Sequence, residues 1–561
     1  MVGSGYVRED KMDDTPLDFK RGQASCFNGE WADRQSGKRR RLRIVIPAYP
    51  SFNTYSRIAR VTTALGPISI ATAAHEIEGW DVEVIDENNY RRSAPRNELG
   101  LPDHETLQKL RPADVVGFYG GLSSTILRVH ELARFYKERG VPTVAGGQHF
   151  IEENIAEALH NGIDVVVIGE GEETVKELLY ALEGRVPRDT IRGIAYMNNN
   201  RIVQTPAREP LTHFDQLPLP DFSLLRYAKI RIFPVGRVRG CGMDCEFCTV
   251  KGKPRYATPE RLMAQISLLY ETFGAKHFFI VDDLFGQDRR ETLRFCHLLH
   301  EYQIGIRKRF ELTVQIRFDK AKDLEMLRAM RGAGVNVVAI GFESPIPQEL
   351  EAMGKHLKPE DMIALSRVFY QAGFLIHGMF IFGYPSEKGA SIRISAQERV
   401  RHFRTFIKKA KIDTIQVLLP VPLPGTKFTQ RLKQENRIFS KESIGWEYYD
   451  GNFPLFVPDE PMTPEEMHQS IQIIMGRFYR FRHMFHVVLN ILSFPLVFLY
   501  LHNIRRGWWK WYRGWRNNLR RFGGWMIVRG WLAKFRRDNF SDKLREGKRK
   551  LDYSSRSDSR R

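Results

Sequence analysis

Residues 239–248 read RGCGMDCEFC, a run in which Cys241, Cys245 and Cys248 supply three of the chain's five cysteines. A chance CxxxCxxC is expected only about 4 × 10⁻⁴ times in a chain of this length and cysteine content. The spacing therefore predicts that the three thiolates bind one metal centre. A zinc site needs a fourth Cys or His at a suitable spacing, and none follows nearby. Three thiolates on one loop favour an iron–sulfur cluster that keeps one iron open.

The cysteine run directly follows the first of six predicted strands between residues 225 and 430. These strands end at Arg237, Val281, Val314, Ile340, Ile381 and Leu419, each before a polar or Gly-containing loop. Six βα units predict a partial (β/α)6 barrel over residues 225–430. The chemistry of such a barrel lies at the carboxyl ends of its strands, which is where the cysteines stand.

A second set of strands precedes the cysteines, over residues 41–205. Apolar runs at residues 42–47, 81–86, 114–118, 142–147 and 164–169 lack polar alternation and are separated by amphipathic stretches. Buried strands with helical crossovers predict a parallel sheet covered on both faces, which is a doubly wound, Rossmann-like α/β domain. Glycines follow three strands, at residues 117–121, 146–147 and 169–171. They form either ordinary tight turns or a cradle for a large planar ligand, and none makes the GxGxxG of a dinucleotide site.

The cysteine loop, with an aromatic residue before its last cysteine, resembles that of the radical S-adenosylmethionine (SAM) superfamily. This resemblance implies that the cysteines hold a [4Fe–4S] cluster whose open iron chelates SAM. Residues 278–283, 315–317, 341–344, 383–387 and 419–426 look like the superfamily's successive strand-end motifs. The implied SAM contacts are Phe247, Gln315, Arg317, Glu343, Ser344, Tyr384 and Pro385. Taken alone, each of these motifs could also be a solvated strand end, a helix cap or a turn.

The domain before the barrel resembles the cobalamin-binding domain of cobalamin-dependent radical SAM proteins. The implied cobalamin contacts are Tyr49, Gly120, Gly121, Leu122, Ser123, Gly146, Gly147, Gln148, His149, Gly169, Glu170 and Gly171. One departure concerns the metal. The related mutases use a DxHxxG loop whose histidine ligates cobalt, and none of the 16 histidines here has Asp two positions before it. The resemblance thus implies a cobalt without a histidine from that motif, while His149 is either near the cofactor or satisfied locally.

The remaining segments differ in composition. Residues 1–40 are predicted to be a flexible basic lead, residues 206–224 a Pro-rich linker and residues 431–483 a helical extension. Residues 484–501 carry no charge but are borderline for a spanning helix, which needs about 20 apolar residues. From His502 onward, 19 Lys and Arg face 5 Asp and Glu, so this stretch holds +14 of the net +20. A basic helix with a tryptophan stripe predicts interfacial membrane docking, through Trp508, Trp515, Arg516, Trp525 and Trp531.

Two other interpretations of this tail stay open, a nucleic-acid arm and a helix packed against the barrel. Nucleic acid is not expected as a partner, because the first 500 residues are only mildly basic. Few cysteines and no signal-peptide opening predict a reducing compartment, on the cytoplasmic face of the inner membrane.

The combined resemblance implies a cobalamin-dependent radical SAM enzyme. The expected reaction is methylation of an unactivated carbon of a hydrophobic or lipid-like substrate through a 5′-deoxyadenosyl radical. A one-electron reductant such as flavodoxin or ferredoxin would supply the electron. The alternative is C–C bond formation or oxidative cyclisation without methyl transfer. An RNA methylthiotransferase is disfavoured because those enzymes carry a second three-cysteine cluster, and only Cys26 precedes residue 240.

Overall fold

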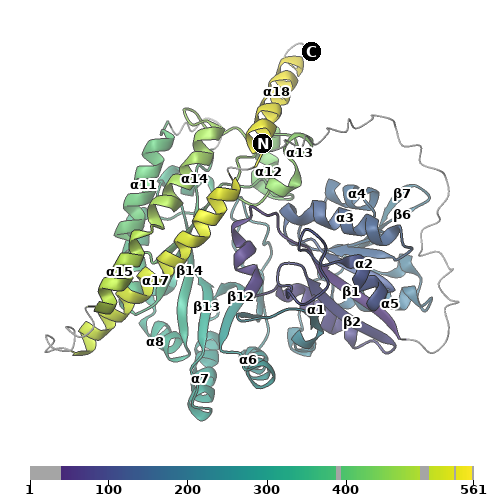
Figure 1. Ribbon diagram of the computed structural model, residues 1–561, viewed down its shortest axis with the longest axis horizontal. Helices are drawn as coiled ribbons and strands as arrows, with labels where there is room; N and C mark the ends of the chain where they lie inside the picture. Colours follow the sequence, from purple (N-terminus) through teal and green to yellow (C-terminus); the bar gives the residue numbers. More distant parts are fainter. Residues whose placement is uncertain (1–38, 387–392, 493–503, 536–537, 559–561) are drawn as a thin grey trace, which may run out of the picture.

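The computed structural model describes residues 39–386, 393–492, 504–535 and 538–558, so nearly all of the predicted basic lead lies outside the described residues. The first domain, on the right in Figure 1, contains a mixed sheet flanked by helices. This sheet has eight strands in the order β7-β6-β5-β4-β3-β1-β2-β8. Its strands are β1 (Arg40–Ile46), β2 (Trp80–Asp86), β3 (Val115–Tyr119), β4 (Thr143–Gly146), β5 (Val165–Val167), β6 (Ile194–Asn198), β7 (Arg201–Gln204) and β8 (Leu225–Arg226). The strands β1 to β5 pair in parallel, and β6 and β7 form an antiparallel hairpin at one edge.

Helices cover both faces of this sheet, which confirms the predicted doubly wound domain. They are α1 (Leu65–His75), α2 (His104–Leu110), α3 (Ile126–Lys137), α4 (Glu153–His160) and α5 (Glu172–Leu182). The α1 and α5 helices pack against each other on one face. The strand order reverses between β1 and β3, and ligands of such sheets bind at the carboxyl ends of the strands near that point.

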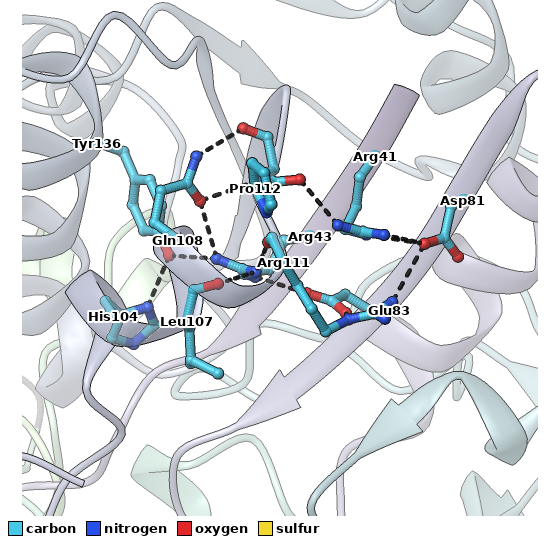
Figure 2. A network of polar contacts seen from close by, with 11 residues as sticks. Arg41, Arg43, Asp81, Glu83, His104, Leu107, Gln108, Arg111, Pro112 and Tyr136 are labelled. Carbon is cyan, nitrogen blue, oxygen red and sulfur yellow. Dashed lines mark hydrogen bonds and ion pairs between the residues drawn. The ribbon is translucent and has the colours of Figure 1, made fainter. Parts of the chain in front are cut away.

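The two faces of the sheet differ in polarity because successive side chains of β1 point to opposite sides. Arg43 is fully buried on the α2–α3 side, where its guanidinium donates to Glu83 at 2.8 Å and to the Tyr136 hydroxyl at 3.0 Å (Figure 2). Leu42 and Ile44, one residue to either side, point instead toward the apolar α1–α5 side. The charged network therefore fixes one layer of helices, while Leu42 and Ile44 of β1 present apolar side chains to the other layer.

The second domain is a six-stranded, all-parallel sheet in the order β16-β15-β14-β13-β12-β9, which confirms the predicted partial barrel. Its strands are β9 (Phe233–Val235), β12 (His277–Phe285), β13 (Glu311–Ile316), β14 (Val335–Glu343), β15 (Leu375–Ile381) and β16 (Thr414–Leu418). The helices around it are α6 (Pro259–Phe273), α7 (Arg289–Gly305), α8 (Leu324–Gly332), α9 (Pro347–Ala352), α10 (Pro359–Gln371) and α11 (Ala396–Lys409). Three strands run further than expected, since β12 continues past Val281, β13 past Val314 and β14 past Ile340.

The linker between the domains is not a free segment. At its end, β8 pairs with β2, so residues 225–226 belong to the edge of the first sheet and not to the barrel. Within it, the Asp215 carboxylate accepts from the Thr258 hydroxyl at 2.6 Å, which ties the linker to the start of α6. The two domains also share one continuous hydrophobic core.

The C-terminal region is helical, as predicted. Its helices are α12 (Lys427–Gln434), α13 (Lys441–Ile444), α14 (Pro464–Phe478), α15 (Arg482–Leu492), α17 (Ile504–Phe535) and α18 (Phe540–Asp558). The α17 helix lies alongside α15 and also packs on α14 and β16 (Figure 1). Among the described residues, no helix combines the length and the apolarity needed to cross a bilayer.

The packing of α17 corrects part of the membrane interpretation. Trp531 is 5% exposed and packs against Phe535, so it cannot face lipid. Trp515 and Trp525 are half-buried, and Trp525 lies 5.0 Å from the Phe481 ring. Arg516 pairs with Glu311 of β13 at 3.3 Å, and the side chain of Trp508 lies outside the described residues. The tryptophan and arginine pattern of this helix therefore reflects packing on the barrel, which was one of the open alternatives.

Candidate functional site

The cysteine loop is shaped by a small hairpin at the mouth of the barrel. Two short strands, β10 (Val238–Arg239) and β11 (Arg255–Tyr256), pair in antiparallel fashion and bring the loop back on itself. Gly240 begins the loop at φ +86°, and a Cβ there would lie 2.8 Å from the Lys253 carbonyl oxygen, so only glycine fits. Its amide donates to Asp283 of β12 at 2.6 Å, which anchors the loop to the barrel.

The three thiols lie on this loop and are half-buried. Burial raises the pKa values of Cys245 and Cys248, so both are ordinary protonated thiols until a metal replaces the proton. The Cys248 sulfur already accepts from the Val250 amide at 3.4 Å. Within the described ranges, no three Cys, His, Asp or Glu side chains are arranged as a preformed metal site. The donor set itself, three half-buried thiols from one loop, fits an iron–sulfur cluster with one open iron.

Several predicted SAM residues surround this loop. Glu343 ends β14 at φ +58°, a backbone conformation that is strained for a glutamate, and pairs with Lys355. Lys355 lies 5.8 Å from the centre of the Phe247 ring. Arg317 contacts the Met243 sulfur at 2.6 Å, and Gln315 is half-buried on β13. A carboxylate, a guanidinium and an aromatic ring thus lie in or next to the cysteine loop, a set of groups that can bind a charged nucleoside.

Other predicted SAM residues support the loop from behind. The Tyr384 hydroxyl, on a side chain with no exposed surface, donates to Glu246 at 2.6 Å. The guanidinium of Arg431, on α12, donates to both oxygens of the Glu246 carboxylate, at 2.7 and 2.9 Å. It also donates to the Pro385 carbonyl at 3.3 Å. Ser344 is fully buried and donates to Glu349. These contacts make Tyr384 and Pro385 supports of the cysteine loop, whereas the Ser344 hydroxyl is bonded to Glu349.

Sequence reasoning missed three residues of this arrangement, Glu246, Lys355 and Arg431. Glu246 stands inside the CxxxCxxC run, and a charge at that position is the one signal that could have singled it out. Lys355 and Arg431 are ordinary surface-type residues in the sequence, and only the fold brings them to the loop.

A cavity of about 470 Å³ lies between the two domains. Its deep end is apolar and runs under the α1–α5 layer, against Leu42 and Ile44 of β1. Its other end is lined by residues at the carboxyl ends of β4 and β5 and by residues 236–239, which precede the cysteine loop. The predicted cobalamin residues that line it are Gly146, Gly147, Gln148, Gly169 and Gly171.

The other predicted cobalamin residues do not line this cavity. A Cβ at Gly120 would lie 2.2 Å from the Phe150 ring, and one at Gly121 equally close to Tyr119, so these glycines serve tight packing. His149 is 3% exposed, bonds Ser123 at 2.9 Å and lies against Trp446. Burial lowers the pKa of His149 to about 3, so the ring is neutral and satisfied locally. Leu122 is exposed, and Tyr49 donates its amide to Asn88.

Glu170 joins the two domains. Its carboxylate accepts from Arg239 at 2.8 Å and from Arg255 at 2.8 and 3.1 Å, both in the hairpin that carries the cysteine loop. Burial would raise the pKa of this carboxyl, but the two guanidinium groups outweigh burial and hold it below its ordinary value. The ion pair between Glu170 and Arg239 therefore holds the glycine turn after β5 next to the start of the cysteine loop. One interior therefore extends from the glycine turns after β4 and β5 to Arg239 and Asp283, next to the cysteine loop.

This arrangement matches two known domains. Residues 57–179 match the B12 binding domain, and residues 236–398 match the Radical SAM superfamily. The chain carries the paired domains of cobalamin-dependent radical SAM proteins. It is a radical SAM enzyme whose cofactors are a [4Fe–4S] cluster, SAM and cobalamin. The glycine-lined cavity and the three-thiol loop are the parts of the structure that fit these groups.

Several proteins similar to this radical SAM enzyme are named as methyltransferases. An uncharacterised methyltransferase of Pyrococcus horikoshii is 28% identical over 71% of this chain and 84% of the relative. The hopanoid C-2 methylase of Rhodopseudomonas palustris is 24% identical over 71% of each chain. Further relatives are named as methyltransferases or as anaerobic magnesium-protoporphyrin IX monomethyl ester cyclases.

Among solved structures, the cobalamin-dependent SAM radical enzyme OxsB shares the fold. Its TM-score is 0.59 at 14% identity, over 91% of this chain and 84% of that one. A match of this extent at such low identity is a likeness of fold.

Proposed function

We propose that this enzyme methylates an unactivated carbon of a hydrophobic or lipid-like substrate. The observation that supports it is the shared interior, in which the cavity below the β4 and β5 glycines extends to Arg239 and Asp283 beside the cysteine loop. A methyl donor and a radical source held at one interior can act on the same carbon. The hydrophobic substrate class rests on the name of one relative, the hopanoid C-2 methylase.

When bound, the cluster with SAM supplies a carbon-centred radical and the cobalamin supplies the methyl group. The protein's own residues position these groups. We assign Cys241, Cys245 and Cys248 to the cluster and Phe247, Gln315, Arg317 and Glu343 to SAM. Glu246, held by Arg431 and Tyr384, fixes the loop, while Glu170 keeps the two domains together around the cavity and excludes water from it. A one-electron reductant is required, and we propose a flavodoxin or ferredoxin.

The test uses anaerobic protein loaded with iron, sulfide and hydroxocobalamin, with titanium(III) citrate as the reductant. A hopanoid hydrocarbon in detergent is the first substrate probe, with ¹³C-methyl SAM. We expect ¹³C-methyl in the product, with one S-adenosylhomocysteine and one 5′-deoxyadenosine formed per methyl transferred. Release of 5′-deoxyadenosine without S-adenosylhomocysteine, across a panel of lipid probes, would contradict methylation. That result would favour the cyclase-type reaction, which the cyclase relatives make the second candidate.

We also propose that the protein docks on the cytoplasmic face of the inner membrane, through α15 and not through the tryptophans of α17. The outer face of α15 exposes Phe485 by 57%, Leu489 by 58% and Leu492 by 67%, although each is a large apolar side chain. Large exposed apolar patches mark interaction sites. The basic C-terminal stretch beside this face suits anionic headgroups, since each nearby cation contributes about 1 kcal/mol.

The double substitution Phe485→Glu with Leu489→Glu should weaken co-sedimentation with anionic liposomes at least tenfold, because two apolar anchors become charged. Each anchor contributes about 1.5–3 kcal/mol when fully buried. The matched control is Ile304→Glu on α7, a residue 63% exposed on the barrel, which should sediment like the unchanged protein. Equal sedimentation of the double variant and the control would exclude α15 as the membrane contact.

A further inference from the structure

Two arginines line the interdomain cavity without an ion-pair partner among the residues that the structure describes. Arg237 follows β9 and is 6% exposed, and its guanidinium donates to the Ala257 carbonyl at 2.7 Å. Arg261 of α6 is half-buried and donates to the carbonyl oxygens of Leu217 and Pro218, at 2.5 and 2.9 Å. Their neighbour Arg239 is different, because Glu170 and Glu172 already neutralise it.

The acids near these arginines form no ion pair with them. One oxygen of Asp282 accepts from the backbone amides of Arg237 and Val238 at 2.6 and 2.9 Å, and its other oxygen is buried without a hydrogen-bond partner among the described residues. Asp283 accepts from the Gly240 amide, and Asp215 accepts from Thr258. A guanidinium removed from water without a counter-ion is costly, so two of them at one cavity indicate that an anion completes the site.

A third feature points to the same place. The α1 helix begins at Leu65 after Ala64, whose side chain makes no capping hydrogen bond. Leu65, Gly66 and Ser69 of its first turns line the cavity, and a Cβ on Gly236 would lie only 3.7 Å from the Leu65 side chain. The positive end of α1 therefore opens on the cavity next to the residue that precedes Arg237. Such an end favours negative charge, and arginine is the residue best suited to a phosphate.

We infer that Arg237, Arg261 and the start of α1 form a binding site for a singly charged phosphate ester, the phosphodiester of the cobalamin nucleotide loop. The rest of cobalamin is uncharged apart from its cobalt centre, since its ring carries neutral amides. The apolar end of the cavity suits the benzimidazole base, and the glycines suit the corrin ring. The barrel, through α6 and the loop after β9, thus contributes to cobalamin recognition by charge. This inference rests on the cobalamin cofactor of the proposed function.

The test compares three corrinoids on the full-length protein stripped of cobalamin: hydroxocobalamin, cobinamide phosphate and cobinamide. Cobinamide lacks the whole nucleotide loop, and cobinamide phosphate restores the phosphate alone. Charge-assisted hydrogen bonds to a phosphate typically change affinity by about tenfold to a hundredfold. We therefore expect the unchanged protein to bind cobinamide phosphate at least tenfold more tightly than cobinamide, measured from the visible spectrum and bound cobalt.

Arg261→Gln and Arg237→Gln should each reduce that preference to less than threefold while leaving the affinity for cobinamide nearly unchanged. Cobinamide binding thus reports that each variant is folded. The matched control is Arg294→Gln on α7, whose side chain is 58% exposed and pairs with Glu260, and it should keep the full preference. Arg261→Lys should keep part of it.

The outcomes separate this inference from the proposed function. A preference that is absent in the unchanged protein, or that survives both glutamine substitutions, would overturn the phosphate site and leave cobalamin as the cofactor. That result would assign the arginines to an anionic group of another ligand, such as a phosphorylated substrate. Failure of the unchanged protein to bind any of the three corrinoids would overturn both proposals.

Discussion

Replacing Cys245 with alanine should abolish the reductive cleavage of SAM. Cys245 stands in the middle of the three-thiol loop, and the loop offers no fourth thiol to take its place. Two remaining thiolates cannot hold a [4Fe–4S] cluster that must also keep one iron open for SAM. We expect the iron content of anaerobically reconstituted protein to fall from about four per chain to well below one. The release of 5′-deoxyadenosine should fall below detection.

The control for this experiment is Cys296→Ala. Cys296 lies on α7 with no exposed surface, and burial raises the pKa of its thiol to about 12, so it is inert at neutral pH. Loss of its sulfur removes little volume and should leave both iron content and SAM cleavage unchanged. Normal deoxyadenosine release from Cys245→Ala would show that the cluster is held elsewhere. Loss of cleavage in both variants would point to a folding defect.

The parts of this protein that could be predicted from the sequence are those encoded locally. A CxxxCxxC run after a buried strand can be recognised within ten residues of sequence, and so can the glycines that follow each of three parallel strands. The glycines at 146, 147, 169 and 171 do line the cavity. Glu246 and Arg431 lie 185 residues apart in sequence, so no local pattern joins them. The free arginines of the cavity are likewise visible only once the linker and α6 meet the first domain.

The interpretations of His149, Glu170 and the tail depend on contacts that a local sequence pattern does not contain. A histidine after a glycine turn looks the same whether it faces a cofactor or a neighbouring tryptophan, and here Trp446 closes over it from a segment about 300 residues away. Glu170 follows a glycine as a ligand-binding residue would, but it clamps the hairpin of the cysteine loop. An amphipathic helix rich in arginine and tryptophan fits a lipid surface or the base of a barrel equally well.

Replacing Arg513 with alanine tests which of these two surfaces α17 uses. Its guanidinium is 6% exposed, lies 3.4 Å over the Tyr370 ring and donates to the Phe374 carbonyl at 2.9 Å. It also pairs with Asp413, which is 2% exposed at the start of β16. Removal leaves a buried carboxylate short of its cation, which typically costs about 3–5 kcal/mol of unfolding free energy. Urea unfolding followed by tryptophan fluorescence should show a clearly lower midpoint.

The matched control on the same helix is Arg529→Ala. Arg529 is exposed and lies 5.4 Å from the Trp525 ring, so its loss should change the unfolding free energy by less than about 0.5 kcal/mol. Adding Asp413→Asn to Arg513→Ala should recover part of the stability, because the unpaired buried charge is then gone. If α17 were a membrane helix that rests loosely on the protein, both arginine variants would unfold alike. A large difference between them, removed in part by the second substitution, would establish α17 as part of the barrel's base and leave α15 as the surface available to lipid.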